Sequence, residues 1–433
     1  MIITVVGMGK IGLPLAVAFA RKGHKVLGAD VNAHTVELIN SGVEPFPGEH
    51  MLADYLADVV AKGQLEATTD TSAAVSRSQA VVVVVPLFVD AEGVPDFGWM
   101  DSATADIARG LQPGTLVAYE TTLPVGTTRN RFAPMLSEGS GLSAGSDFHL
   151  VFSPERVFTG RVFADLRKYP KLVGGITEAS TQAGISFYEA VLDFDEREDL
   201  PRPNGVWDMG SSEASEMAKL AETTYRDVNI GLANQFARFA ADNGIDVYRV
   251  IDACNSQPFS HIHQPGIAVG GHCIPIYPRM YLWNDPAATV VRAAREANAA
   301  MPEYTVSVLD SLVHGLQHKR VAVLGAAYRG GVKETAFSGV FPTVTALKSA
   351  GATALVHDPM YTDEELAKYG LDAYHLGESV DAVIVQADHA SYAELVDSDL
   401  PGAIAVVNGR SALKLKNLTR IPVVNLGVGS PSQ

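Results

Sequence analysis

The stretch IITVVGMGKIG, residues 2–12, opens the chain and decides its fold class. Its first five residues are all β-branched, which predicts a buried strand, and three glycines spaced as GxGxxG follow at once. Gly7 permits a tight turn, Gly9 lets the backbone approach a pyrophosphate, and Gly12 lets a helix pack against the strand. This pattern predicts a dinucleotide site with the pyrophosphate at the helix N-terminus, and a glycine turn without a ligand is the alternative.

Asp30 is the second element of this predicted site. It ends the strand expected at residues 25–29, where a carboxylate can accept hydrogen bonds from the ribose of a bound dinucleotide. The same negative charge would repel a 2′-phosphate. The sequence therefore favours NAD over NADP.

Short apolar strands alternate with helical segments in both terminal thirds of the chain. Such runs between helices indicate parallel sheets covered on both faces. The expected fold is α/β, with two Rossmann-like doubly wound domains, residues 1–200 and 306–433, joined by a helical region, residues 201–305. Beyond residues 2–6 and 25–29, strands are predicted at residues 80–85, 116–119, 149–152, 320–324, 353–357, 382–386, 403–407 and 422–426.

The middle of the chain is predicted to be helical. One long central helix spans residues 211–243, and further helix is expected at 246–254 and from 287 to about 316. The apolar positions of the long helix keep helical spacing, so they form either a dimerisation surface or a face that packs within the chain. These positions are Met217, Leu220, Ala221, Thr224, Val228, Leu232, Phe236 and Phe239.

Composition excludes several classes of function. The 433 residues carry a net charge of −16, with 47% hydrophobic and 19% charged residues, which indicates a globular protein and argues against nucleic acid as a partner. Two cysteines give no disulfide framework, so a cytoplasmic location is expected. The chain opens into a strand instead of a signal peptide, and its apolar run at residues 80–86 is too short to span a membrane.

Cys273 lies in the segment GGHCIP, residues 270–275. The glycines permit close approach of a ligand, and a histidine directly before the thiol could favour the nucleophilic thiolate. A buried, inert cysteine is the alternative. Beside a nicotinamide cofactor, a thiolate can convert an aldehyde to a thiohemiacetal and then to a thioester that water releases.

Helper residues for this chemistry are less clearly marked. Lys219 and Thr223 are four positions apart on the long helix and share a face, although a solvated surface is the plainer interpretation of a helical lysine. His261, His263 and His272 could act in acid–base chemistry or serve only structure. No Asp, Glu or further Cys falls at ligand spacing, so no metal site is predicted.

Several motifs together carry a resemblance to a known family. They are GMG at residues 7–9, ETTLPVGTT at 120–128, FSPER at 152–156, KLAETTYRDVN at 219–229 and GGHCIP at 270–275. With these motifs in this order, nearly the whole chain resembles the nucleotide-sugar 6-dehydrogenases, the family of UDP-glucose, GDP-mannose and UDP-N-acetylhexosamine dehydrogenases. The histidine before the cysteine is more similar to the N-acetylhexosamine branch than to the UDP-glucose branch.

The resemblance implies two successive NAD-dependent oxidations at C6 of a UDP-sugar, which give a uronate for polysaccharide and related glycans. It implies that Cys273 forms the thioester, Lys219 stabilises the oxyanion, and Glu155 and Thr122 position water and reach the nicotinamide. Thr223 joins this catalytic set, and the central helix forms the core of a homodimer. The implied cofactor-binding residues are Gly7, Met8, Gly9, Lys10, Ile11, Gly12, Asp30, Pro86 and Thr122. The implied substrate-binding residues are Phe152, Lys219, Phe259, His261, Gly270, His272, Tyr277, Arg329 and Lys333.

The chain also departs from the family's pattern. Tyr277 stands where the family has Asp, Thr223 where it has Asn, and Phe259 where it has Arg; Arg329 and Lys333 replace a Lys and an Arg. Loss of the Asp removes a carboxylate, because tyrosine carries no charge near neutral pH. Either the site is adapted to another sugar and completes both oxidations, or the enzyme stops at the 6-aldehyde. A single-step β-hydroxyacid dehydrogenase and an inactive sensor of NAD and sugar nucleotide are further alternatives.

Overall fold

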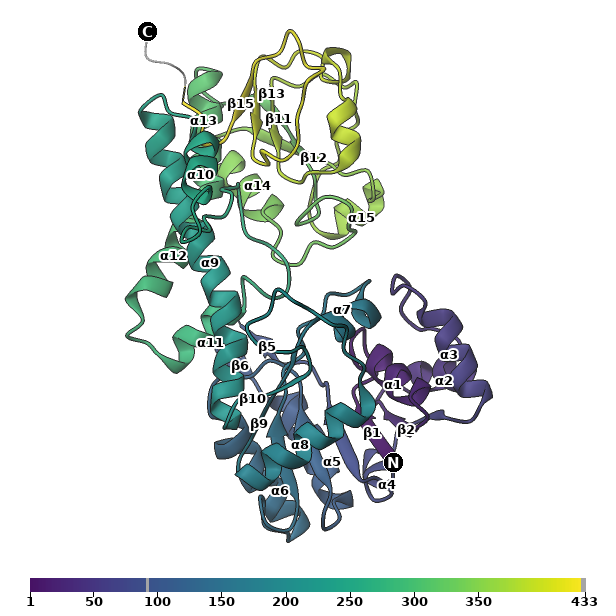
Figure 1. Cartoon of the computed structure of the whole chain (residues 1–433). Coiled ribbons are helices and arrows are strands. Elements are labelled where there is room, and N and C mark those ends of the chain that lie inside the picture. Colours follow the sequence, from purple (N-terminus) through teal and green to yellow (C-terminus); the bar gives the residue numbers. More distant parts are fainter. Residues whose placement is uncertain (91–92, 430–433) are drawn as a thin grey trace. The chain divides into compact units, whose positions relative to one another are not determined.

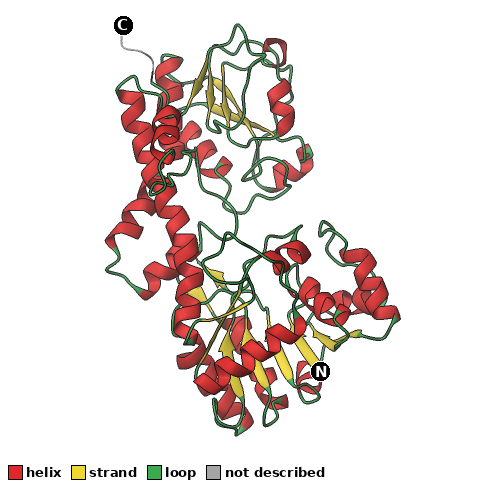
Figure 2. Ribbon diagram, viewed as in Figure 1, coloured by secondary structure: helices red, strands yellow, loops and turns green. Residues whose placement is uncertain are grey.

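The computed structural model describes residues 1–90 and 93–429, and these residues form two compact units (Figures 1 and 2). The first unit spans Met1–Glu222, and the second begins at Thr223. The boundary falls within α9 (Ser212–Asp242), the long central helix that the sequence predicts at residues 211–243. The three-domain boundaries expected from the sequence stay predictions.

The first unit contains, among its described residues, an eight-stranded sheet in the order β10-β9-β8-β7-β4-β1-β2-β3. From β3 to β8 the strands follow the 3-2-1-4-5-6 order of a dinucleotide-binding sheet, whose ligand crevice lies where the order reverses, beside β1 and β4. The strands are β1 (Ile2–Val6), β2 (Lys25–Ala29), β3 (Leu65–Thr68), β4 (Ala80–Val83), β7 (Leu116–Tyr119), β8 (His149–Phe152), β9 (Lys171–Gly175) and β10 (Val206–Asp208), and β5 (Phe88–Val89) pairs with β6 (Pro95–Asp96) in a separate hairpin.

One edge of this sheet corrects the expectation of a purely parallel arrangement. Strand β9 runs antiparallel to β8, with Val151 opposite Gly175 and Phe152 opposite Gly174. Strand β10 then pairs in parallel with β9. Strands β3, β9 and β10 are not among those predicted from the sequence, and the direction of a short apolar strand is not encoded in its side-chain pattern.

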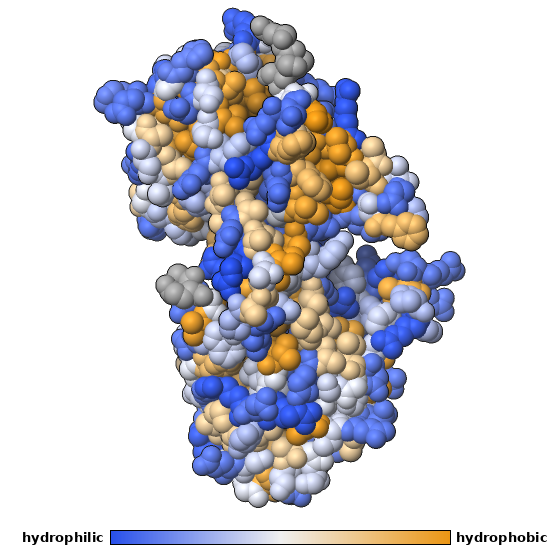
Figure 3. Space-filling model, turned by 90° about the vertical axis from the view of Figure 1, so that its left-hand side faces the viewer, coloured by the Kyte–Doolittle hydropathy of each residue, from blue (hydrophilic) through white to orange (hydrophobic). Residues whose placement is uncertain are grey.

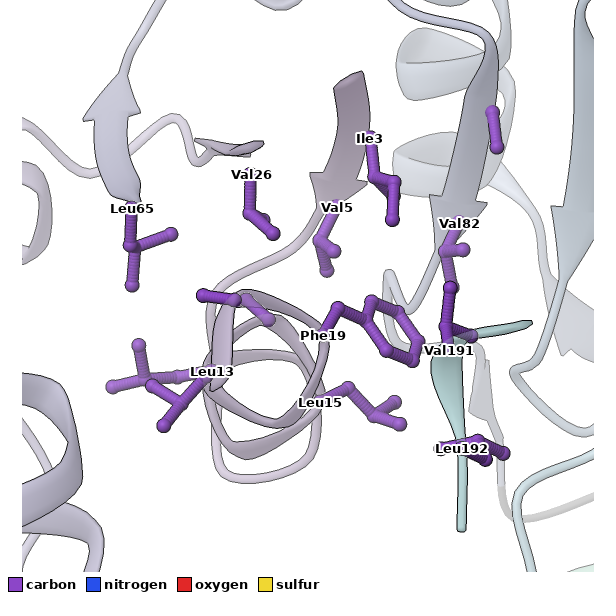
Figure 4. Close-up of a cluster of buried hydrophobic side chains, with 14 of the residues drawn as sticks. Ile3, Val5, Leu13, Leu15, Phe19, Val26, Leu65, Val82, Val191 and Leu192 are labelled. Atoms are coloured by element: carbon purple, nitrogen blue, oxygen red, sulfur yellow. The ribbon is translucent and has the colours of Figure 1, made fainter. Parts of the chain in front are cut away.

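Helices cover both faces of the sheet, and alternate strand residues point to opposite faces. On one face, Leu13, Leu15 and Phe19 of α1 pack beneath Ile3 and Val5 of β1 (Figure 4). On the other face, helices α5 and α6 contribute buried side chains to a second cluster. The helices are α1 (Gly12–Arg21), α2 (Ala33–Asn40), α3 (Leu52–Ala61), α4 (Thr71–Val75), α5 (Gly98–Gly110), α6 (Ala133–Ser140), α7 (Val162–Lys168) and α8 (Glu178–Val191), and a π-helical turn, Thr128–Phe132, precedes α6.

The second unit contains a five-stranded parallel sheet in the order β12-β11-β13-β14-β15. This is the 2-1-3-4-5 order of the other common doubly wound sheet, with its crevice between β11 and β13. The C-terminal α/β region predicted from the sequence is therefore confirmed. The strands are β11 (Arg320–Leu324), β12 (Thr353–His357), β13 (Ala382–Val385), β14 (Val406–Asn408) and β15 (Val423–Asn425).

The helical part of the second unit differs from the prediction at one point. The helix expected from residue 287 to about 316 is two helices, α12 (Thr289–Ala299) and α13 (Met301–Leu312). Pro302 lies in the first turn of α13, where a missing N–H costs nothing, but it cannot continue a preceding helix. The remaining helices are α10 (Val247–Asn255), α11 (Tyr277–Asn284), α14 (Val340–Ser349) and α15 (Asp363–Lys368). No helix in residues 1–90 and 93–429 combines the length and apolarity needed to cross a membrane.

Candidate active site

The glycine turn after β1 has the geometry that a dinucleotide requires. Gly7 has φ +91°, which favours glycine, and a Cβ on Gly12 would lie 1.9 Å from the carbonyl oxygen of Gly7. By contrast, apart from Gly9 itself and its two chain neighbours, no atom of the described residues lies within 4 Å of the position that a Cβ on Gly9 would take. Two glycines therefore serve packing, and the third leaves open space beside the N-terminus of α1, where a pyrophosphate fits.

Asp30 closes the other side of this turn. One carboxylate oxygen accepts a hydrogen bond from the amide of Met8 at 2.8 Å, and the other accepts one from the amide of Asn32 at 2.9 Å. The carboxylate is thereby fixed at the end of β2 and stays partly exposed. Of the other predicted cofactor-binding residues, Lys10 and Pro86 are exposed and Ile11 is partly buried.

The loop after β7 is fastened at both of its ends. The Thr121 hydroxyl donates to the carbonyl oxygen of Val85 at 2.6 Å, which ties the loop to the end of β4, and the neighbouring Thr122 is buried. Further along, Glu216 of α9 accepts hydrogen bonds from the amides of Gly126 at 2.5 Å and Thr128 at 2.9 Å and from the Thr128 hydroxyl at 2.7 Å. Burial raises the pKa of Glu216 to about 7, against the opposing effect of these bonds.

A buried ion cluster lies at the carboxyl edge of the same sheet. The Lys171 ammonium is 2.9 Å from a carboxylate oxygen of Glu120 and 2.9 Å from one of Glu155. The Tyr188 hydroxyl donates to the other Glu120 oxygen at 2.6 Å. Burial and the charge of Glu155 raise the pKa of Glu120 to about 7, whereas the Lys171 ammonium holds the pKa of Glu155 below its usual value in spite of burial. Phe152, a predicted substrate contact, is fully buried at the end of β8.

Lys219 lies on α9 one turn after Glu216 and is 8% exposed. Its ammonium is 3.3 Å from a carboxylate oxygen of Glu222, whose other oxygen accepts a hydrogen bond from Arg156 at 2.9 Å. Arg156 directly follows Glu155 in the chain. Within the first unit, contacts from Lys219 to Glu222 and from Glu222 to Arg156 therefore link Lys219 to the residue next to Glu155. Glu216, on the same helix as Lys219, holds the loop that carries Thr122.

The second unit presents Cys273 at a tight turn. Gly271 has φ +93°, and its amide donates to the carbonyl oxygen of Ala336 at 2.8 Å, while a Cβ on Gly270 would lie 2.5 Å from the Cβ of Tyr328. The turn is thus pressed against the loop 328–337 that follows β11. Cys273 is exposed, and its carbonyl oxygen accepts hydrogen bonds from the amides at the start of α11.

The other predicted residues of the second unit differ in their contacts and in their exposure. The His272 ring is 3.3 Å from a Glu334 carboxylate oxygen, and Tyr277 is the first residue of α11. Arg329 donates to the Tyr328 hydroxyl at 3.2 Å, but the Lys333 ammonium is 2.6 Å from a carboxylate oxygen of Glu365 on α15. Phe259 is 92% exposed. His261 is also exposed, and Thr223 is buried on α9.

Sequence reasoning missed the residues that support the predicted site. Lys171 begins a strand, where a lysine usually marks a solvated flank, and Tyr188 belongs to the apolar face of α8. Glu216 is not predicted because nothing in the helical pattern before Lys219 distinguishes it from the other polar residues of α9. The sequence signal for Lys171 is a lysine directly before a continuous apolar run. If that strand is buried from its first residue, the lysine is buried with it and needs a buried carboxylate as its partner.

Comparison with protein families covers most of the chain. The UDP-glucose/GDP-mannose dehydrogenase family matches in three successive parts: its NAD binding domain at residues 1–192, its central domain at residues 213–300 and its UDP binding domain at residues 322–417. The glycine turn and the ion cluster lie within the first matched region, Lys219 and Cys273 within the second, and the loop 328–337 within the third.

Individual relatives match over nearly their full length. The UDP-N-acetyl-D-mannosamine dehydrogenase of Pyrococcus horikoshii is 32% identical over 95% of this chain and 96% of its own. The NDP-N-acetyl-D-galactosaminuronic acid dehydrogenase of Ralstonia solanacearum is 30% identical over 96% and 97%. A solved structure of the P. horikoshii UDP-D-ManNAc dehydrogenase superposes with a TM-score of 0.86 at 29% identity, covering 99% of this chain and 100% of that one.

Proposed function

Because the chain belongs to the UDP-glucose/GDP-mannose dehydrogenase family, we propose that it is an NAD-dependent 6-dehydrogenase that oxidises a UDP-N-acetylhexosamine twice, to the uronate, through Cys273. The observation that carries this proposal is the placement of an exposed thiol on a glycine turn pressed against the first loop of the UDP-binding half. A sugar nucleotide held by that loop would present its sugar to the thiol.

The first unit would hold the cofactor. Its diphosphate would lie over Gly9 at the N-terminus of α1, and Asp30 would receive the adenosine ribose. NAD supplies the chemistry of accepting a hydride from C6 in each oxidation. The remaining steps fall to side chains of this chain.

Cys273 would act between the two oxidations. Its thiolate sulfur adds to C6 of the aldehyde to give a thiohemiacetal, and loss of a hydride from C6 then gives a thioester. Water attacks the thioester carbon, the C–S bond breaks, and the uronate and the thiolate are released. Lys219 would stabilise the oxyanion, and Glu155 would hold the water and accept its proton.

The choice of sugar follows the relatives. The relatives from P. horikoshii and R. solanacearum, at 32% and 30% identity, are named for N-acetylated UDP- or NDP-sugars. A UDP-glucose dehydrogenase structure from Pyrobaculum islandicum matches at a lower identity of 25%, with a TM-score of 0.83. We therefore rank UDP-N-acetylhexosamines first and UDP-glucose second. An NADH-production screen across UDP-GlcNAc, UDP-ManNAc, UDP-glucose, UDP-galactose and GDP-mannose tests this ranking, and turnover of GDP-mannose alone would contradict it.

A second candidate function rests on Tyr277 and Thr223, which replace an expected Asp and Asn. If thioester hydrolysis is lost with them, the enzyme stops at the 6-aldehyde. Counting NADH per sugar consumed separates the two: a value of two supports the uronate, and a value of one supports the aldehyde. A single-step β-hydroxyacid dehydrogenase has no use for the UDP-binding region at residues 322–417, and any turnover of a UDP-sugar dismisses an inactive sensor.

We also propose that the protein is a homodimer through α9. Its second-unit part exposes an apolar stripe at Tyr225 (55%), Leu232 (44%), Phe236 (39%) and Phe239 (65%). Figure 3 shows patches of apolar surface on the second unit. Sedimentation velocity tests this: Phe239→Asp should shift the protein to monomer, and a monomeric wild-type protein would overturn the proposal. Two free cysteines suit a reducing cytoplasm, where we place the reaction.

A further inference from the structure

The buried ion cluster of Lys171, Glu120, Glu155 and Tyr188 is larger than a water-binding carboxylate needs. Lys171 is 4% exposed and Glu120 is 1% exposed, so their charges are almost wholly removed from solvent. Burying charged groups costs several kcal/mol each unless they are paired. A chain that keeps a buried lysine, a second buried carboxyl group and a tyrosine hydroxyl beside a predicted catalytic carboxylate has a use for their arrangement.

The fold explains how Lys171 reaches this place. In a parallel sheet, the carboxyl ends of all strands meet at one edge, and the first residues of the strands lie at the other. Strand β9 runs antiparallel to β8, so its first residue, Lys171, lies at the carboxyl edge. The register pairs Phe152 with Gly174, and continuing it by three residues places Glu155 opposite Lys171. The reversal of one strand therefore delivers a cation to the predicted water site.

Within the cluster, Lys171 holds Glu155, and Glu120 and Tyr188 hold Lys171. The Lys171 ammonium is shared between Glu155 and Glu120, at 2.9 Å each, and lies 4.8 Å from the centre of the Tyr188 ring. Glu120 is fixed on its other side by the Tyr188 hydroxyl at 2.6 Å. Glu155 also accepts a hydrogen bond from the amide of Arg156 at 2.8 Å. One ammonium thus fixes the predicted base through one bond and is itself fixed through the other.

We propose that Lys171, anchored by Glu120 and Tyr188, is a positioning residue that keeps Glu155 ionised and oriented for hydrolysis of the thioester. This inference rests on the proposed function, because it takes Glu155 as the carboxylate that binds the attacking water. The groups that face Glu155 are Lys171 of β9, Glu120 after β7, Tyr188 of α8 and the neighbouring Arg156, which is paired with Glu222 of α9.

The first test replaces the cation. Lys171→Met should leave the pre-steady-state burst of NADH intact, since both oxidations precede hydrolysis, and should slow steady-state turnover about ten-fold or more at pH 7. The pH midpoint of turnover should rise by about one unit or more, because Glu155 loses the ammonium that keeps it ionised. Lys171→Arg should restore most of the rate. Loss of burst and turnover together, with an unchanged pH midpoint, would mean that Lys171 only supports the fold.

A matched control and a second variant keep this test decisive. Lys25 also begins a strand and pairs with a carboxylate, that of Glu66 at 2.9 Å, so Lys25→Met should change neither burst nor pH midpoint. Because Lys171→Met leaves two carboxylates unpaired and could unfold the unit, Glu120→Gln is the gentler change. It removes a negative charge beside Glu155 and should move the pH midpoint of turnover downward, opposite to Lys171→Met. Shifts of the same sign in both variants would overturn the proposal.

The outcome also separates this inference from the proposed function. If the wild-type protein produces no NADH with any UDP-sugar, or only one NADH per sugar, the uronate-forming function fails, whatever the variants do. If the wild-type protein gives two and Cys273→Ser gives no acid, the function stands, and the pH midpoints alone decide the role of Lys171.

Discussion

The two α/β halves begin with the same turn and use it differently. In the first half, Gly7 follows β1, and the amide of Met8 donates to Asp30 at the end of β2. In the second, Gly325 (φ +109°) follows β11, and the amides of Ala326 and Ala327 donate to Asp358 at the end of β12, at 2.8 and 3.0 Å. The same turn and the same acidic partner thus occur in both halves, but their surroundings differ.

The difference lies in what fills the turn. The position of Gly9 is open, whereas its counterpart Ala327 is fully buried and has given its amide to Asp358. The Asp358 carboxylate also contacts the His389 ring at 3.1 Å and accepts a hydrogen bond from the amide of Met360 at 2.9 Å, so both of its oxygens have protein partners. Asp30, by contrast, keeps a partly exposed carboxylate. The first turn offers free amides and an acid to a ligand, and the second consumes both for its own packing, so a second dinucleotide has no place there.

A bulky side chain in the first turn is the change with the largest expected effect. Gly9→Val should leave the first unit folded, because the side chain enters open space, but should weaken NAD binding about a thousand-fold, or about 4 kcal/mol, by blocking the diphosphate. Binding of UDP should not change. Isothermal titration of NAD and of UDP measures both affinities in one preparation.

The matched change in the other half is Ala327→Gly. It should lower the stability of the second unit by about 1 kcal/mol or less, through added backbone freedom, and should leave the NAD affinity of the protein unaltered. An increase in the number of NAD sites per chain would show that the second turn can accept a dinucleotide after all, and the contrast between the halves would be lost.

How much of this contrast was predictable depends on the range of the interactions. The sequence predicted the glycine turn, Asp30, the long helix and the second α/β region, because each is encoded within about 30 residues by spacing and composition. It did not predict the reversal of β9, and hence Lys171 beside Glu155, because pairing direction is decided by the whole sheet. It marked Cys273 by local chemistry and by resemblance, and Lys219 by resemblance. It did not predict the contacts that hold the Cys273 turn, from His272 to Glu334 and from Gly271 to Ala336, because they join segments far apart in the chain.

The buried carboxyls give the second largest expected effect, in opposite directions for the two halves. Burial raises the pKa of Glu216 to about 7 in the first unit, while hydrogen bonds from His389 and backbone amides hold the pKa of Asp358 in the second unit below its usual value in spite of burial. A folded-state pKa above the unfolded value of 4.5 means that the folded unit binds the proton more tightly. The contribution of Glu216 to the free energy of unfolding is therefore largest below about pH 4.5 and falls by about 3 kcal/mol as pH rises to about 7.

Glu216→Gln tests this sign. The variant should be less stable than wild type at pH 5 and should lose the decline between pH 5 and 8, so the difference between the two proteins shrinks as pH rises. Trp283 lies in the second unit, and Trp99 and Trp207 lie in the first, so urea unfolding followed by tryptophan fluorescence in a Trp283→Phe background reports the first unit alone. If the difference in the free energy of unfolding stays constant between pH 5 and 8, Glu216 does not titrate in this range, and the prediction is wrong.

A smaller effect than that of Glu216 is expected for the pair that closes the second turn. His389 is 3% exposed, and its ring nitrogen at 3.1 Å is the side-chain partner of the buried Asp358 carboxylate. Replacing it by Phe keeps the ring volume but leaves the carboxylate with backbone donors only, which should destabilise the second unit by about 1–2 kcal/mol. His389→Gln keeps a donor and should recover about half of that loss.

The pH dependence of this effect follows from the lowered pKa of Asp358. The stabilisation by the Asp358 carboxylate is present above the pKa of about 3.8 that the group has in the unfolded chain, and it is lost as pH falls through the lower pKa of the folded state. The Phe variant should therefore approach the stability of the wild type in acid. Trp283 fluorescence in a background without Trp99 and Trp207 measures this unit, and a loss that instead grows in acid would mean that His389 stabilises the turn by packing and not by its bond to Asp358.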